Sequence, residues 1–290
     1  MRSRPVLLVL TGIASVQIGA AFAKSMFDEA SPSAIAWLRL LTSSLILLAV
    51  VRPRLRRAPG DWAVAAAFGV ALGLMNWLIY QSFARIPLGI AVTLEFVGPL
   101  LLAAGTSKRR RDLLWVGLAG LGVLLLGASR SSGHGVTVVG AAAALGAGAA
   151  WASYIVLSAR TGRTWPGLDG LAIASCVACL VVTPMAALQP TGLGHAQVWW
   201  VGVAVGLLSS VIPYSCELVA LRSISPNVFG VLMSLEPAAA ALAGLVVVHE
   251  HLTAPQWLAL TCVISASAGM TRTSGRSSGP SSHATDGEAA

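Results

Sequence analysis

The sequence predicts an all-α integral membrane protein with ten transmembrane helices, arranged as two inverted repeats of five helices each. The composition is the first observation: 56% of the 290 residues are hydrophobic, only 10% are charged, and the mean hydropathy is +0.79. Soluble globular domains carry roughly 25% charged residues, so this chain cannot cover a water-facing surface. The other two observations are ten long apolar runs and an uneven distribution of Lys and Arg between alternate loops.

The apolar runs have the length of membrane spans, because a helix needs about 20 mostly apolar residues to cross the bilayer. In the first repeat, which we place at residues 1–132, the runs lie at about 5–23, 33–51, 61–81, 88–105 and 113–129. In the second repeat, at residues 136–272, they lie at about 136–158, 168–188, 197–219, 227–248 and 255–271. Residues 273–290 are rich in Ser and Gly and have no apolar face, so we expect a disordered cytoplasmic tail.

The first run also resembles a secretory signal peptide, because it has a basic start and the sequence Ala21-Phe22-Ala23 before Lys24. The run is long and many others follow, so we expect an uncleaved first helix. With the N-terminus in the cytoplasm, the inner loops hold 15 Lys and Arg and the outer loops hold 3. This asymmetry follows the positive-inside rule. We therefore expect both termini in the cytoplasm. We interpret the net charge of +8 as a consequence of this orientation in the membrane and not as a sign of nucleic-acid binding.

The two halves carry related motifs. LEFVGP at 94–99 and LEP at 235–237 both place Glu and Pro inside an apolar run. Matching Arg85 to Arg222 gives an offset of 137 residues, and matching Pro99 to Pro237 gives 138. Since five spans is an odd number, the second half must enter the membrane from the opposite side. Inverted repeats of this kind are typical of transporters, which bind substrate near the midplane between them.

Three acids lie within the predicted spans: Glu95, Glu217 and Glu236. A charged side chain at a helix centre costs about 2.5 to 3.5 kcal/mol on translocon scales. Desolvation favours the protonated carboxyl, so such a group can exchange a proton as a cavity opens. For Glu95 and Glu236 we favour a functional role over a protonated carboxyl bonded across a helix interface. For Glu217, near the cytoplasmic end, a substrate role and simple access to water remain equal alternatives.

Two prolines support the prediction of a functional role for Glu95 and Glu236. Proline lacks an N–H and clashes with the carbonyl four residues earlier, so Pro99 frees the carbonyl of Glu95 and Pro237 that of Met233. A freed carbonyl must be satisfied by protein or face a water-filled cavity. The pairing of acid and proline in both halves therefore predicts a polar cavity. Neutral groups suited to a polar solute would complete it: Gln17, Asn76, Tyr80, Gln81, Tyr154 and Tyr214.

Other polar features have simpler explanations. Cys176 and Cys179 form a C-x-x-C pattern, but we interpret them as small apolar residues of a buried helix. His249-Glu250-His251 is not a metal-site motif, and we expect it in an outer loop. Arg39 either snorkels outward or pairs with a carboxylate. No P-loop lysine motif occurs, and we expect neither a cofactor nor a metal.

Several stretches resemble a known family: SVQIGAAFAKSMF (15–27), PLGIAVTLEFVGPLL (87–101), ALGAGAAWASYIVLSAR (144–160), IPYSCELVALRSISPNVFGVLMSLEPAAAALAGLVVVHEHLT (212–253) and QWLAL (256–260). They are similar to EamA domains of the drug/metabolite transporter superfamily, and in particular to bacterial threonine/homoserine exporters. The resemblance extends to about residue 272. One departure is His249, where the family commonly has Gly before Glu250; we expect only a local effect.

The resemblance implies a ten-span exporter of the bacterial inner membrane that works by alternating access as an antiporter driven by the proton gradient. Its substrates would be threonine, homoserine and related small amino acids. The chief rival is export of another small metabolite or a cationic drug by the same mechanism. The residues indicate neither an enzyme nor a sensor, because no nucleophile–base pair, metal triad or signalling domain is evident. A passive channel would leave the paired carboxylates unexplained.

Overall fold

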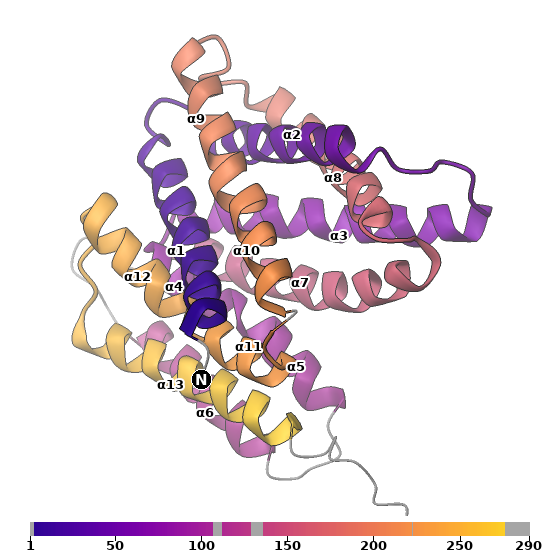
Figure 1. The fold of residues 1–290 in the computed structure, drawn as a ribbon. Helices are drawn as coiled ribbons and strands as arrows, with labels where there is room; N and C mark the ends of the chain where they lie inside the picture. The colour runs from indigo at the N-terminus through magenta and orange to yellow at the C-terminus, as the bar shows by residue number, and fades with distance from the viewer. Residues whose placement is uncertain (1–2, 107–111, 129–135, 222, 276–290) are drawn as a thin grey trace, which may run out of the picture.

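The computed structural model describes residues 3–106, 112–128, 136–221 and 223–275, and these residues form helices without any strand (Figure 1). In the first half the helices are α1 (Ser3–Ser25), α2 (Pro32–Val51), α3 (Pro59–Phe83), α4 (Leu88–Glu95), α5 (Val97–Thr106) and α6 (Asp112–Ala128). In the second half they are α7 (Val138–Thr164), α8 (Asp169–Leu188), α9 (Ala196–Gly206), the π-helical turn η1 (Leu207–Val211), α10 (Ile212–Leu221), α11 (Pro226–Met233), α12 (Glu236–Val247) and α13 (Ala254–Gly275).

Seven helical segments are long and apolar enough to cross a membrane: Arg4–Ser25, Pro32–Val51, Pro59–Phe83, Leu88–Thr106, Val138–Thr164, Asp169–Leu188 and Val228–Val247. Two shorter apolar helices, Asp112–Leu126 and Ala196–Val211, lie between them in the chain. The expectation of an all-helical chain with several membrane spans is therefore confirmed. The count of ten spans stays a prediction. Of the predicted tail, residues 273–275 belong to α13 and residues 276–290 lie outside the described part.

Polar side chains cap two of the long helices where the sequence places them. Ser31 precedes α2, and its hydroxyl accepts a hydrogen bond from the Ala34 N–H at 3.1 Å. Thr137 precedes α7 and accepts from the Gly140 N–H at 3.1 Å. Each cap satisfies an N–H group that has no partner within the helix. These caps fix where the helices begin and therefore which residues face inward.

Helix pairs of the two halves pack in matching ways. The contact between α3 and α7 has a counterpart in α1 against α10, and α4 against α7 has one in α12 against α1. In addition α2 packs on α8, and α6 packs on α13, which lies beside it in Figure 1. In the predicted order of spans, the α3–α7 and α1–α10 contacts join equivalent pairs of helices, and so do the α4–α7 and α12–α1 contacts. The α2–α8 and α6–α13 contacts each join a helix to its own equivalent in the other half. Such paired contacts are expected of two related halves.

Two helices are interrupted at the predicted Glu-Pro motifs. The first break lies at Phe96, between Glu95 at the end of α4 and the start of α5; the second lies between α11 and Glu236, the first residue of α12. Pro99 and Pro237 both fall in the first turn of the helix that follows the break. A proline costs little there, because the first turn has no partner for its N–H in any case. The prolines therefore begin new helices, and each glutamate stands at a helix end.

Candidate functional site

A cavity of about 490 Å³ lies among α1, α2, α3, the two interrupted helices, α7, η1 and α13. Its wall is mixed, with apolar side chains such as Phe96, Trp151 and Met233 beside a smaller set of polar ones. The polar residues of the wall are Gln17, Arg39, Asn76, Glu95, Tyr154, Ser209, Glu236, Ser267 and Thr271. An apolar pocket with a few convergent polar groups is the usual form of a small-molecule site.

Both helix breaks deliver an acid to this cavity. Glu95 is 9% exposed and Glu236 is 8% exposed, and both line the wall. Glu95 interacts electrostatically with Glu236 and with Arg39. Glu236 is the first residue of α12 and therefore lies at the positive end of that helix dipole, whereas Glu95 is the last residue of α4. Two buried acids and one cation thus share a single chamber.

The carbonyl of Glu95, which Pro99 leaves without its helical partner, faces α7. A Cβ added at Gly148 would lie 2.5 Å from this oxygen. Gly98 also meets the Gly148 backbone so closely that a Cβ there would collide with the Gly148 carbonyl oxygen. Only glycine permits this approach of α5 to α7. The break, the freed carbonyl and the two glycines therefore form one helix crossing beside the cavity.

The other predicted residues divide into three groups. Gln17, Asn76 and Tyr154 line the cavity with the two acids, and the Asn76 amide donates to the Leu72 carbonyl at 2.9 Å. Tyr80 and Gln81 do not line it. Tyr80 is fully buried behind the wall, and Gln81 donates to the Ser33 hydroxyl at 3.1 Å. The side chains of Tyr214 and Glu217 lie outside the described residues, although their helix α10 is described.

Four polar residues of the wall were not predicted as site residues: Arg39, Ser209, Ser267 and Thr271. The sequence left the role of Arg39 open; the structure turns its side chain into the cavity wall, where Nη2 donates to the Ser209 carbonyl at 3.4 Å. Ser209 reaches the wall because it lies in η1, and π-helical turns commonly mark functional sites. A charged residue within a predicted span could have indicated a site role for Arg39, whereas no sequence pattern predicts the π-helical turn that places Ser209 in the wall.

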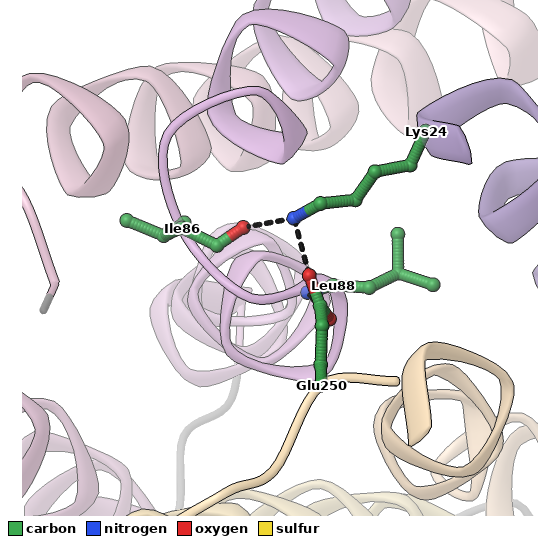
Figure 2. A network of polar contacts seen from close by, with 4 residues as sticks. All are labelled: Lys24, Ile86, Leu88 and Glu250. Atoms are coloured by element: carbon green, nitrogen blue, oxygen red, sulfur yellow. Dashed lines mark hydrogen bonds and ion pairs between the residues drawn. The ribbon is translucent and has the colours of Figure 1, made fainter. Parts of the chain in front are cut away.

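A second polar cluster ties together three segments at one end of the cavity (Figure 2). The Lys24 ammonium lies 2.6 Å from the Glu250 carboxylate and donates to the Ile86 carbonyl at 2.7 Å. The other Glu250 oxygen accepts a hydrogen bond from the Leu88 N–H at 2.8 Å. The end of α1, the start of α4 and the loop after α12 are thereby joined. Glu250 was predicted to be only a polar loop residue, and this contact between distant segments was missed.

The backbone beside this cluster is unusual. His249 has φ of 58°, in the left-handed region that favours glycine. The turn lets the Glu250 N–H donate to the Gly244 carbonyl at 3.0 Å, which directs the carboxylate toward α4. Within the described part of the chain, no group of three or more His, Cys, Asp or Glu is placed to hold a metal ion.

Comparisons with known proteins give consistent findings. Residues 3–130 and 138–272 each match the model of the EamA-like transporter family. The threonine/homoserine exporter RhtA of Escherichia coli K12 is 44% identical over 272 residues, which cover 93% of this chain and 92% of that protein. RhtA of Salmonella typhimurium SL1344 is 43% identical with the same coverage, and the uncharacterized transporter YwfM of Bacillus subtilis 168 is 28% identical over 82% of this chain and 83% of its own.

A crystal structure of a protein with the same fold covers 96% of this chain and 100% of its own, with a TM-score of 0.64 and 19% identity. At that identity the likeness concerns the fold alone.

Proposed function

The chain belongs to the EamA-like transporter family, and from this premise we propose that it exports small amino acids such as threonine and homoserine. The observation that carries the proposal is 44% identity over 93% of the chain to a protein named as a threonine/homoserine exporter. The relatives are named as transporters rather than enzymes. The chain is a multi-pass membrane protein, and we place it in the bacterial inner membrane with both termini in the cytoplasm.

We propose that the ten predicted spans form two inverted repeats. The two separate ranges that match the family model, 3–130 and 138–272, support this division. The matched helix contacts support it as well, because α3 on α7 and α1 on α10 would be equivalent pairs. In this arrangement α4 with α5, and α11 with α12, are the interrupted fourth and ninth spans. The cavity then lies between the repeats, where transporters of this kind bind their substrates.

Proton coupling is assigned to the acids of the cavity. Glu95 and Glu236 are buried and interact with each other, and two neighbouring buried carboxyls resist simultaneous ionisation. A proton taken from outside would be held in this pair and released to the cytoplasm as the protein changes state. The entry of an amino acid, with its ammonium group, would favour loss of that proton. Glu217 stays a candidate for the same role.

Alternating access requires that one end of the cavity close while the other opens. The Lys24–Glu250 pair joins α1, α4 and the loop after α12 at one end, which is the outer end in the predicted orientation. Toward the cytoplasmic end the cavity wall extends to Ala103, Gly230 and Thr271, each within about one turn of the end of its helix. We therefore assign this structure to the state that faces the cytoplasm, with the outer end closed by the ion pair.

Cells offer a simple test of the substrate. Overproduction of the protein should let bacteria grow at otherwise inhibitory threonine or homoserine and should lower the intracellular pool of both. A Glu95→Gln/Glu236→Gln variant produced at the same level is the control. Unchanged tolerance and unchanged pools would reject the amino-acid substrate and favour the rival, another metabolite or a cationic drug. The acids of the cavity would suit a cation as well, which is why the substrate has to be measured.

A further inference from the structure

Arg39 has the position of a ligand-binding residue. It lies in the membrane segment Pro32–Val51, lines the cavity, and sits over the Tyr80 ring with its guanidinium carbon 5.8 Å from the ring centroid. Its guanidinium donates a long hydrogen bond to the Ser209 carbonyl, at 3.4 Å. Glu95 interacts electrostatically with Arg39, so the guanidinium lies near the acids of the cavity. Because Arg39 lines the cavity, its N–H donors can reach a molecule bound there.

Unsatisfied polar atoms surround the same place. Gln17 and Ser209 are each 4% exposed and line the cavity, and the Gln17 Oε1 and Ser209 Oγ have no hydrogen-bond partner in the described structure. Buried polar atoms of native proteins are nearly always bonded, and each exception calls for an explanation. A bound solute that supplies the missing partners explains these two. Arg39, Gln17 and Ser209 come from α2, α1 and η1 and converge on one wall.

The chemistry of this group indicates what it binds. A guanidinium presents a planar fork of N–H donors that matches a carboxylate, and Arg is preferred over Lys where such bidentate contact is needed. The Ser209 hydroxyl supplies one more donor. The ring of Tyr80 beneath Arg39 limits the orientations of the fork. Glu95 and Glu236 line the same cavity and offer negative charge to an ammonium group.

We propose that Arg39 binds the α-carboxylate of the transported amino acid, with the Ser209 hydroxyl as a second donor and Gln17 Oε1 as an acceptor for the ammonium group. The inference rests on the proposed amino-acid export and deepens it by naming the residue that selects amino acids over amines. The ammonium group then faces the acids that hold the proton. A purely structural role for Arg39, stacked on Tyr80, is the alternative.

Matched ligands separate the two roles. Threonine amide keeps the ammonium and hydroxyl of threonine but lacks the carboxylate, whereas 3-hydroxybutyrate keeps the carboxylate and lacks the ammonium. We would measure binding of all three compounds and of homoserine to the purified full-length protein by titration calorimetry. The variants are Arg39→Gln and Arg39→Lys. The matched control is Arg85→Gln, which removes an exposed arginine that is bonded to Gln81 and lies outside the cavity.

We expect Arg39→Gln to weaken threonine binding by about tenfold or more, which corresponds to 1.4 kcal/mol or more, while the affinity for threonine amide stays unchanged. Arg39→Lys should restore part of the affinity for threonine, and Arg85→Gln should have no effect. Equal loss for threonine and its amide, or no loss for either, would overturn the carboxylate contact while amino-acid export stands. If the unaltered protein binds neither threonine nor homoserine, the proposed function fails and this inference fails with it.

Discussion

The ammonium group of Lys24 at the end of α1 lies 2.6 Å from the carboxylate of Glu250 in the loop after α12. The side chains are 14% and 15% exposed, so this pair is largely withdrawn from solvent. The same carboxylate binds the first N–H of α4, which places the pair at the start of an interrupted helix. Opening of this end of the cavity requires the contact to break.

Removal of Lys24 should therefore open the outer end. In the variant Lys24→Met, Glu250 loses its ionic partner. For fully buried pairs such a loss costs about 3–5 kcal/mol, and this slightly exposed pair should lose less. We expect a cysteine placed at the buried position Ile86 to react several times faster with a membrane-impermeant thiol reagent in this variant. The four native cysteines are replaced first. The control variant Arg85→Gln removes an exposed cation beside Ile86 and should leave the rate of thiol labelling unchanged. If labelling in Lys24→Met were no faster than in the unaltered protein, the proposal that the Lys24–Glu250 pair closes this end of the cavity would be contradicted.

The acids of the cavity should be needed for coupling rather than for folding. Glu95→Gln and Glu236→Gln preserve size and hydrogen-bonding capacity but cannot exchange a proton. We expect normal expression of both variants, strongly reduced export driven by a proton gradient, and a flattened dependence of export on pH in proteoliposomes. Unchanged transport and an unchanged pH profile in both variants would move the proton site elsewhere, with Glu217 as the next candidate.

The crossing of α5 and α7 should tolerate no side chain at Gly98. A Cβ there collides with the Gly148 carbonyl oxygen, and overpacking of a close contact typically costs about 1–3 kcal/mol. We expect Gly98→Ala to lower the thermal midpoint of the purified protein by several degrees. Gly105→Ala is the matched control in the same helix, because nothing lies within 4 Å of its added Cβ; it should be neutral or slightly stabilising. Equal midpoints for both variants would argue against the close crossing.

The turn before Glu250 should be relieved by glycine. His249 adopts φ of 58°, and a left-handed residue with a side chain costs roughly 1–2 kcal/mol. His249→Gly should raise the free energy of unfolding by up to about 1 kcal/mol, since part of the gain is lost to the greater freedom of glycine when unfolded. His251→Gly, in the same loop at a position without positive φ, should be neutral or destabilising. Loss of stability in His249→Gly would mean that the imidazole itself contributes.

Sequence patterns predicted the membrane class and the family resemblance, and these are confirmed by the helical fold and the family match. Glu95 and Glu236 reach one cavity because each borders a helix break, and a motif with Glu and Pro lies at both breaks. The ten-span count, the domain boundaries and the roles of the site residues stay predictions.

Side-chain direction was harder to predict than helix position. The cavity face of α3 carries Asn76, Ile79 and Phe83, which fall on one stripe of a helix with 3.6 residues per turn. Tyr80 lies at the edge of this stripe and turns toward Phe27, and Gln81, roughly 140° around the helix from Asn76, faces away. Polarity alone selected these two residues, because the sequence does not reveal which stripe of a buried helix faces the cavity.

Long-range contacts could not be predicted from the sequence, for a different reason. Lys24 and Glu250 belong to loops and helix ends that are 226 residues apart in sequence, and no local pattern brings them together. Ser209 depended on a π-helical turn, which shifts the register of the chain without a proline or glycine at that residue. In both cases tertiary packing decides which polar groups meet.

The most direct test of amino-acid export is transport by the purified protein in proteoliposomes. With an imposed proton gradient and no chemical gradient of threonine or homoserine, the protein should move either amino acid uphill, against the direction of proton flow, and a proton ionophore should abolish the movement. The Glu95→Gln/Glu236→Gln variant should show no uphill movement under the same gradient. Absence of uphill transport of both amino acids, with the protein correctly inserted and a cationic drug or another metabolite moved instead, would contradict export of threonine and homoserine by this chain.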